Sequence, residues 1–356
     1  MRSSRFTVRA ATVIAALVLQ VSCVLAPGPT PPAGAGAPVA TTQVWPPPPA
    51  PARVRFVRSV SSAADWGISR GLLGRISDAF TGRRDDSLVR PTGVAERDGV
   101  LYVADPGAQS LVILDGQRHR ETRVHRLGNL TLMSPVSVAL GPADTVFVAD
   151  SFLKQVYCIA RDGTLVRTLA HEGWSRPAAI AYDGRRDRLY LADSMAHRVF
   201  VMTAEGKSVG SLGEHGDQPG AFNSPTHLAL DGDGNLLVTD ALNFRILTFT
   251  PDGRLLGSFG SHGDGAGNFA APKGVATDAA GHVYVADAMF DAVQIFRRDG
   301  RLLLGFGTQG VGPGEFWLPN GITISASGHL YVADAYNRRL QEFEILPGPP
   351  DEASAP

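Results

Sequence analysis

Six aspartates recur along the chain at the end of the same kind of short apolar run, and a ring of carboxylates could hold a metal ion or supply general acids. Each run is close to Leu330-Tyr-Val-Ala-Asp334, and the aspartates step by 45, 43, 47, 47 and 47 residues: Asp105, Asp150, Asp193, Asp240, Asp287 and Asp334. A catalytic or metal site needs a few unlike groups that converge, whereas a residue required in every repeat is normally architectural. We therefore predict that these carboxylates accept hydrogen bonds from backbone amides at strand ends.

A second repeated position is a better candidate for chemistry. Each aspartate run is preceded by a proline, and the residues directly after the six prolines are Thr92, Val136, Ala178, Thr226, Lys273 and Asn320. If these residues begin the innermost strands of a ring of sheets, a polar, partly basic cluster gathers at one mouth of the central channel: Thr92, Thr226, His227, Lys273 and Asn320. We predict a ligand-binding site there. The alternative is a structural lining with bound water.

Other motifs that could bind metal or act as nucleophiles are incomplete. Asp231-Gly-Asp-Gly-Asn235 places oxygen ligands at alternate positions, as the start of a calcium loop does. Such a loop closes with a bidentate glutamate, and here the chain enters Leu236-Leu-Val instead, so a tight turn between two strands is expected. The chain contains neither a Gly-x-Ser-x-Gly elbow nor a phosphate-cradling loop. We therefore assign no catalytic residue and no metal ligand, and we expect no cofactor.

Histidines occupy matching places in two glycine-rich connections. His215 and His262 stand at equivalent positions, with Gln309 in the third connection, so they could lie near each other on one face. Two histidines without a carboxylate or a third histidine make a poor zinc site, and we expect them to be exposed loop residues. His282 and His329 fall in strand turns and are expected to be solvated.

The elements that must position these residues are short strands. Most repeats contain four apolar runs of four to six residues, separated by turns such as Asp252-Gly253 and Asp299-Gly300. Runs of this length rich in Val, Ile, Leu, Tyr and Phe are typical of strands, and no repeat has the ten or more residues at a 3.6 period that a helical array needs. A period near 47 with four strands predicts an all-β, six-bladed β-propeller, because ring closure removes exposed sheet edges.

The two ends of the repeat region are expected to share one blade. The sixth repeat lacks a fourth strand of its own, and Arg53-Val-Arg-Phe-Val-Arg-Ser-Val60 alternates polar and apolar residues as a half-exposed strand does. We predict that this N-terminal strand closes the ring in the last blade. Ile68, Leu72, Leu73, Ile76 and Phe80 recur at helical spacing, which predicts a short helical insertion at about 66–82 with Asp65 as its cap.

The first 52 residues are expected to lie outside the propeller. Residues 1–22 have the build of a secretory signal peptide, with Arg2, Arg5 and Arg9 before an apolar stretch. Cys23 stands where a bacterial lipoprotein carries its lipidated cysteine; the alternative is an ordinary signal peptidase site. Residues 23–52 form a Pro-rich tether, residues 53–346 the propeller and residues 347–356 a disordered tail. We therefore expect a membrane-anchored lipoprotein of the bacterial cell envelope that faces the periplasm or the exterior.

Charge and cysteine content limit the partners. The formal net charge is -1, with 33 basic and 34 acidic residues, so no global field favours nucleic acid. Cys158 is the one cysteine besides Cys23, and it falls inside an apolar strand, so no disulfide framework exists. We expect a monomer that binds a protein or a small molecule and reaches the membrane through a lipid on Cys23.

The last three repeats carry a pattern that resembles NHL repeats. It combines spaced glycines, Gly-x-Phe, Pro-x-Gly-Val-Ala, Gly-x-Val-Tyr-Val-Ala-Asp and Asn-x-Arg. Examples are Pro272-Lys-Gly-Val-Ala276, Gly281-His-Val-Tyr-Val-Ala-Asp287 and Asn337-Arg-Arg339. The resemblance implies a six-bladed propeller, in a family that includes protein-binding, RNA-binding and enzymatic members. One NHL-like enzyme, peptidyl-hydroxyglycine lyase, binds zinc through histidines directly after the repeat prolines. None of the six post-proline residues here is histidine, and His227 lies one position further on.

Two functions follow from these observations. The first is an exported propeller that acts as a rigid binding or scaffold platform for a protein or small ligand. The alternative is a metal-dependent lyase or hydrolase with its site in the propeller channel. The first is favoured because the repeats are intact while no catalytic constellation is assembled.

Overall fold

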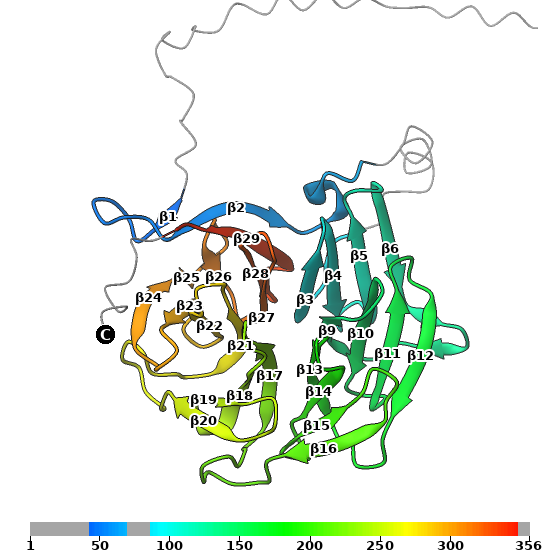
Figure 1. Ribbon diagram of the computed structural model, residues 1–356. Helices are drawn as coiled ribbons and strands as arrows, with labels where there is room; N and C mark the ends of the chain where they lie inside the picture. Colours follow the sequence, from blue (N-terminus) through cyan, green and yellow to red (C-terminus); the bar gives the residue numbers. More distant parts are fainter. Residues whose placement is uncertain (1–42, 70–85, 348–356) are drawn as a thin grey trace, which may run out of the picture. The chain divides into compact units, whose positions relative to one another are not determined.

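The computed structural model describes residues 43–69 and 86–347. In them the chain forms five four-stranded antiparallel sheets and one five-stranded antiparallel sheet arranged radially, with two short two-stranded ribbons (Figure 1). The predicted six-bladed β-propeller is confirmed. Blade 1 consists of β3 (Gly93–Arg97), β4 (Val100–Asp105), β5 (Ser110–Asp115) and β6 (Arg120–Val124). Blade 2 consists of β9 (Pro135–Leu140), β10 (Thr145–Asp150), β11 (Gln155–Ala160) and β12 (Leu165–Ala170). Blade 3 consists of β13 (Pro177–Asp183), β14 (Arg188–Asp193), β15 (Arg198–Met202) and β16 (Ser208–Leu212).

Blades 4 to 6 follow the same order from the centre outward. Blade 4 consists of β17 (Pro225–Leu230), β18 (Leu236–Asp240), β19 (Arg245–Phe249) and β20 (Leu255–Phe259). Blade 5 consists of β21 (Pro272–Thr277), β22 (Val283–Asp287), β23 (Ala292–Phe296) and β24 (Leu302–Phe306). The C-terminal part of the chain contributes β27 (Pro319–Ile324), β28 (His329–Asp334) and β29 (Arg339–Ile345) to blade 6. The ribbons pair β7 (Arg126–Leu127) with β8 (Leu130–Thr131) and β25 (Thr308–Gln309) with β26 (Glu315–Phe316), and η2 (Ala241–Asn243) is a single 3-10 turn.

Blade 6 is completed by the N-terminal part of the chain, as predicted. Strand β2 (Val54–Val60) pairs antiparallel with β29, which places Val60 opposite Leu340 (Figure 1). The sheet gains one further strand that the sequence did not indicate, β1 (Val44–Trp45), which pairs with β2. The Trp45 ring lies 5.2 Å from Phe306 and 5.8 Å from Phe343. The end of the segment expected to be tether therefore belongs to the blade, because aromatic contacts partly bury its indole.

Charged side chains reinforce this closure. Glu342 of β29 is 3% exposed, and its carboxylate accepts hydrogen bonds from Arg58 Nε at 2.5 Å, His329 Nδ1 at 2.7 Å and the Tyr331 hydroxyl at 3.1 Å. The Arg58 guanidinium also lies 4.1 Å above the Trp66 ring. One buried carboxylate therefore joins β2 to β28 and β29, and we call these five residues the latch network.

The predicted helical insertion begins as a different element. The chain forms a 3-10 turn, η1 (Ala63–Trp66), capped by Ser62, and Asp65 is the third helical residue of a capping box instead of the cap itself. Ile68 is buried, and residues 70–85, with the rest of the predicted helix, lie outside the described residues.

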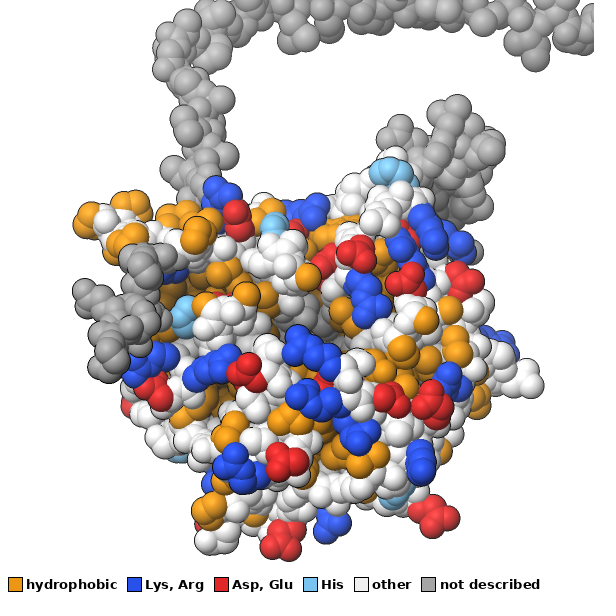
Figure 2. Space-filling model, viewed as in Figure 1, with side chains coloured by type: hydrophobic (Ala, Val, Ile, Leu, Met, Phe, Trp, Pro, Cys, Tyr) orange, Lys and Arg blue, Asp and Glu red, His pale blue; other side chains and the backbone are white. Residues whose placement is uncertain are grey.

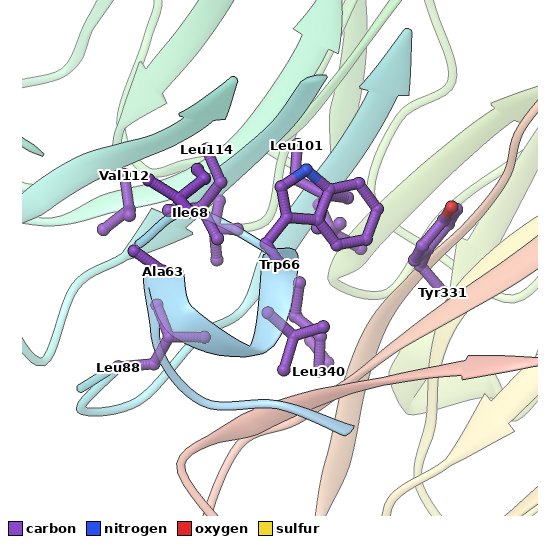
Figure 3. Packing of buried hydrophobic residues seen from close by; sticks show 13 residues of the cluster. Ala63, Trp66, Ile68, Leu88, Leu101, Val112, Leu114, Tyr331 and Leu340 are labelled. Atoms are coloured by element: carbon purple, nitrogen blue, oxygen red, sulfur yellow. The ribbon is translucent and has the colours of Figure 1, made fainter. Parts of the chain in front are cut away.

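The core is divided among the junctions between blades. Six clusters of buried apolar residues each join two neighbouring sheets. The cluster between blades 6 and 1 also receives Trp66 and Ile68, which pack against Leu101, Leu114 and Tyr331 (Figure 3). Each blade buries both of its faces, so no blade has an independent core, and stability depends on ring closure.

The innermost strands approach one another closely at the end where they begin. A Cβ atom on Gly274 of β21 would lie 2.5 Å from the Asn320 carbonyl oxygen, and one on Gly321 of β27 would lie 2.2 Å from the Thr92 carbonyl oxygen. Glycine is required at both positions because any side chain would push neighbouring strands apart. The close approach of these strands brings the residues that follow the repeat prolines near one another, and they form the candidate site described next.

Candidate functional site

The repeated aspartates have the structural role predicted for them. In blade 5 the Asp287 carboxylate accepts hydrogen bonds from the amides of Ala270 at 2.8 Å, Ala271 at 2.9 Å and Met289 at 3.0 Å. Asp105, Asp150 and Asp193 accept from amides in the same two places, and all six aspartates are fully buried. Each carboxylate therefore ties the turn after the second strand to the segment that enters the first.

The post-proline cluster is partly assembled. His227 of β17 in blade 4 reaches past blade 5, and its Nε2 lies 3.1 Å from Oδ1 of Asn320 in blade 6. A carboxamide oxygen can only accept, so Nε2 carries the proton and Nδ1 is the bare nitrogen. Lys273 of β21 lies between these two residues in blade order and is close enough to influence the His227 charge. Three of the five predicted residues thus come together.

The electrostatics of the cluster disfavour positive charge. Burial, with the nearby Lys273 ammonium as a second cause, lowers the pKa of His227 to about 3, and the hydrogen bond that His227 donates to Asn320 opposes this only in part. Burial also lowers the pKa of Lys273, against the attraction of Asp287. His227 is therefore neutral near pH 7. Among the described residues no hydrogen-bond partner is found for His227 Nδ1, and none forms an ion pair with Lys273.

The two threonines of the predicted cluster differ. The Thr92 hydroxyl donates to the Val136 carbonyl oxygen at 2.9 Å, so it links blades 1 and 2 and is already used. The Thr226 hydroxyl is buried and has no hydrogen-bond partner in the part of the chain that the structure describes. Thr226 lies at a β-bulge between Pro225 and His227 at the start of β17.

A central chamber of about 590 Å³ runs along the axis of the ring. All six innermost strands line it; Thr92 and His227 lie in its wall at the end where these strands begin, and Asp98 and Ser327 lie at the other end. Lys273, Asn320 and Thr226 are not part of the lining. The walls combine polar and apolar groups, and each of the six strands contributes one of the apolar residues Val94, Val138, Ile180, Leu228, Val275 and Ile322. A chamber of this size suits a small molecule.

A second cavity of about 320 Å³ lies between blades 4 and 5 and includes Asp231 and Arg298. The Asp231 segment is a tight turn, as predicted: the Asp231 amide donates to the Asn235 carbonyl oxygen at 3.0 Å, and the Asp231 carboxylate accepts from the Asn235 amide. Arg298 pairs with Asp233 at 2.9 Å, so the acidic turn is held by a neighbouring blade.

The two histidines of the glycine-rich connections, His215 and His262, are exposed, as expected. The His215 ring lies 4.2 Å from that of His197, and the His262 ring lies 4.4 Å from that of Phe244, so each packs within its own blade junction. Within the described ranges no group of three or more potential metal ligands is found. His282 and His329, expected to be solvated, are only partly exposed, because Nδ1 of each donates to a largely buried carboxylate, that of Asp278 and that of Glu342 respectively.

Sequence reasoning missed one repeated surface feature. The second residue after the aspartate is large, apolar and exposed in five of the six blades: Phe152, Met195, Leu242, Met289 and Tyr336. The recurrence is visible in the sequence once the repeats are aligned, but exposure depends on how the turn is oriented. We call these five residues the apolar crown.

Comparison with known proteins identifies the repeat and the fold. The family model of the NHL repeat matches residues 316–343, which confirms the resemblance seen in the sequence. No curated protein sequence matches significantly. A streptogramin B lyase structure has a TM-score of 0.55 at 14% identity, over 72% of this chain and 93% of that one.

Two structures from Bacteroides thetaiotaomicron are also similar. A structural genomics protein of unknown function has a TM-score of 0.61 at 18% identity, over 83% of this chain and 76% of that one. An auxiliary nutrient binding protein has a TM-score of 0.58 at 15% identity, over 73% and 70% of the two chains. At these identities the likeness extends to the propeller fold and not to the site.

Proposed function

We propose that this chain is an exported, membrane-anchored lipoprotein whose NHL-type propeller is a rigid binding platform for a small ligand or a protein. The observation that carries the binding function is the chamber of about 590 Å³, lined by polar and apolar residues of strands from all six blades. A similar structure is described as an auxiliary nutrient binding protein, which is consistent with such a role. Rigidity comes from the latch network and from the six buried aspartates.

The proposed partners exclude nucleic acid. Basic and acidic side chains are interspersed over the face seen in Figure 2, which gives no extended surface of positive charge. The export and anchoring parts of the proposal are supported by the sequence of residues 1–52 alone. Within the described residues no helix is long and apolar enough to cross a membrane. In this proposal a lipid on Cys23 attaches the chain to the membrane, and the propeller functions as a monomer.

Filling the chamber tests the binding function. Thr323 lines the chamber and Thr168 lies exposed on the outer strand β12, so Thr323→Trp fills the cavity while Thr168→Trp adds the same side chain outside it. We expect native mass spectrometry of protein purified from its own cells to show a bound small molecule with the native chain and with Thr168→Trp, and none with Thr323→Trp. Equal occupancy in both variants, or no bound molecule in the native chain, would contradict binding in the chamber.

Membrane attachment is tested separately. Cys23→Ser should move the protein from the membrane fraction to the soluble fraction after cell breakage, since lipidation requires the thiol. A variant that stays in the membrane fraction would show that Cys23 does not anchor the chain.

A lyase or hydrolase is the second candidate, because similar structures include streptogramin B lyase and virginiamycin B lyase from Staphylococcus aureus, the latter at 13% identity. The residue able to contribute from the chamber wall is His227, whose bare Nδ1 could bind a metal ion or accept a proton. Elemental analysis of the purified chain decides between the candidates. A stoichiometric metal that is lost in His227→Ala would favour the enzyme.

A further inference from the structure

The apolar crown is held rigidly on one face of the ring. In blades 2, 3 and 5 the buried aspartate accepts a hydrogen bond from the amide of the crown residue itself, at 3.1 Å for Phe152, 3.1 Å for Met195 and 3.0 Å for Met289. The crown side chains are nevertheless 68%, 62%, 57%, 66% and 51% exposed, in chain order from Phe152 to Tyr336. Turn positions are usually polar, so five large apolar residues at equivalent exposed positions indicate a surface that another molecule covers.

The crown surrounds the end of the channel at which the innermost strands begin. In each blade the turn that carries the crown residue is hydrogen-bonded to the residues just before the repeat proline. The Ala288 amide donates to the Ala271 carbonyl oxygen at 3.0 Å, and the Tyr336 amide donates to the Trp317 carbonyl oxygen at 3.2 Å. Trp317 is itself 46% exposed, and its ring lies 5.7 Å from that of Tyr336. Met289, Tyr336 and Trp317 therefore lie close to the first residues of β21 and β27.

The centre of this face offers hydrogen-bond donors without a matching anion. Lys273 is the second residue of β21, and no described residue forms an ion pair with its ammonium group. Asn320 is the second residue of β27; its Oδ1 accepts from His227, which leaves the Nδ2 group as a donor. The charge of the nearby Asp287 is already compensated by backbone amides. A partly buried ammonium with no counter-ion favours an anionic ligand.

We propose that the apolar crown and Lys273 together form a docking surface for an apolar peptide segment that ends in a free carboxylate, such as the C-terminus of a partner protein. The carboxylate would accept hydrogen bonds from Lys273 Nζ and Asn320 Nδ2, and the preceding apolar side chains would cover Leu242, Met289 and Tyr336. A bare anion would leave the crown exposed, and a neutral apolar surface would leave Lys273 unpaired. This inference rests on the proposed platform function and names its protein partner.

The test compares two peptide pools that differ only at the terminal group. Fluorescein-labelled octapeptides whose last four residues are drawn from leucine, methionine, phenylalanine and alanine are made once with a free C-terminal carboxylate and once as C-terminal amides. Their binding to the full Cys23→Ser chain is followed by fluorescence anisotropy. We expect the free-acid pool to bind about tenfold or more tightly than the amide pool, as a charge-assisted hydrogen bond requires.

Variants assign the two parts of the surface. Lys273→Gln should abolish the difference between the pools, and Leu242→Ser and Met289→Ser should weaken both pools severalfold. Leu256→Ser is the matched control, because Leu256 is 48% exposed but lies on the outer strand β20. This variant should bind both pools as the native chain does. Equal affinity of the two pools, absence of binding, or a difference that survives Lys273→Gln would overturn the proposal.

Two further measurements exclude other occupants of the crown. Binding to phosphatidylcholine vesicles that is lost in Met289→Ser but kept in Lys273→Gln would assign the crown to a membrane surface and overturn the peptide proposal. Sedimentation equilibrium that shows a dimer lost in Leu242→Ser would assign it to a second copy of this chain, with the same consequence. The chamber and the Cys23 anchor are tested by the earlier experiments, so their failure is distinguishable from failure here.

Discussion

The substitution Glu342→Gln tests whether the latch network stabilises the closed ring. The native carboxylate is 3% exposed and accepts from Arg58, His329 and Tyr331 at 2.5, 2.7 and 3.1 Å. Removing one partner of a buried ion pair typically costs about 3–5 kcal/mol. The Arg58 side chain is 40% exposed and water can solvate its charge once the carboxylate is removed, so the cost of leaving Arg58 unpaired is smaller. We expect the free energy of unfolding to fall by about 2 kcal/mol.

Glu344→Gln is the matched control. Glu344 lies on the same strand, two residues further on, and pairs with Arg55 of the same partner strand, with an Nε–Oε2 distance of 2.9 Å. Its side chain is 33% exposed and that of Arg55 is 44% exposed, so this pair should contribute less than about 1 kcal/mol.

The measurement is guanidinium-induced unfolding followed by circular dichroism, with the free energy taken from the transition midpoints. Glu342→Gln should shift the midpoint clearly more than Glu344→Gln, and both transitions should remain single because the blades share their cores. If the two variants lose the same stability, the buried carboxylate does not hold the closure, and the reasoning from burial is refuted.

Three further predictions concern the channel end and the aspartates. Because the pKa of His227 is about 3 against an ordinary value of 6.5, the unfolded chain binds more protons between these values. The contribution of neutral His227 to the free energy of unfolding should thus be fully present above pH 6.5 and fall by about 2 kcal/mol between pH 7 and pH 5. Guanidinium-induced unfolding at both pH values measures this loss, and the variant His227→Gln should not show it. Gly321→Ala should lower the free energy of unfolding by about 2 kcal/mol or more. Gly210→Ala should lower it little, because a Cβ atom at Gly210 has no other atom within 4 Å. Equal unfolding midpoints for the two variants would contradict the close approach of the innermost strands. Asp287→Asn should lower the free energy of unfolding by about 2–3 kcal/mol, whereas Asp299→Asn, in an exposed turn, should lower it by less than about 1 kcal/mol. Hydrogen exchange of the Ala270 and Ala271 amides should accelerate only in Asp287→Asn. Unchanged exchange in that variant would refute the structural role of Asp287.

Much of the architecture follows from local pattern. The run that ends at Asp334 and its five equivalents alternate with turn residues at a nearly constant period, so strand number and blade number could be predicted without coordinates. The closing strand was predictable for a related reason: the last repeat lacks an outer strand, and an open sheet edge must be paired. Trp45 was missed because two residues are too few to show alternation.

The candidate site was only partly predictable. Residues after the repeat prolines were correctly placed at the start of the innermost strands, but the contact between His227 and Asn320 depends on a β-bulge in β17 and on the close strand approach at Gly274. The Thr92 hydroxyl, counted as a binding group, is used by the Val136 carbonyl oxygen of the next blade. Neither fact has a local sequence pattern.

The amino-acid sequence by itself determined the repeat, the strands, the six blades and the residues available at the channel end, because strand alternation and turn chemistry act over a few residues. Only the tertiary structure decided which of those residues meet. The latch joins residues 284 positions apart, and His227 and Asn320 are 93 positions apart, so their contacts depend on how the blades curve and close. Exposure of the apolar crown was decided in the same way, since each buried aspartate orients the turn that follows it.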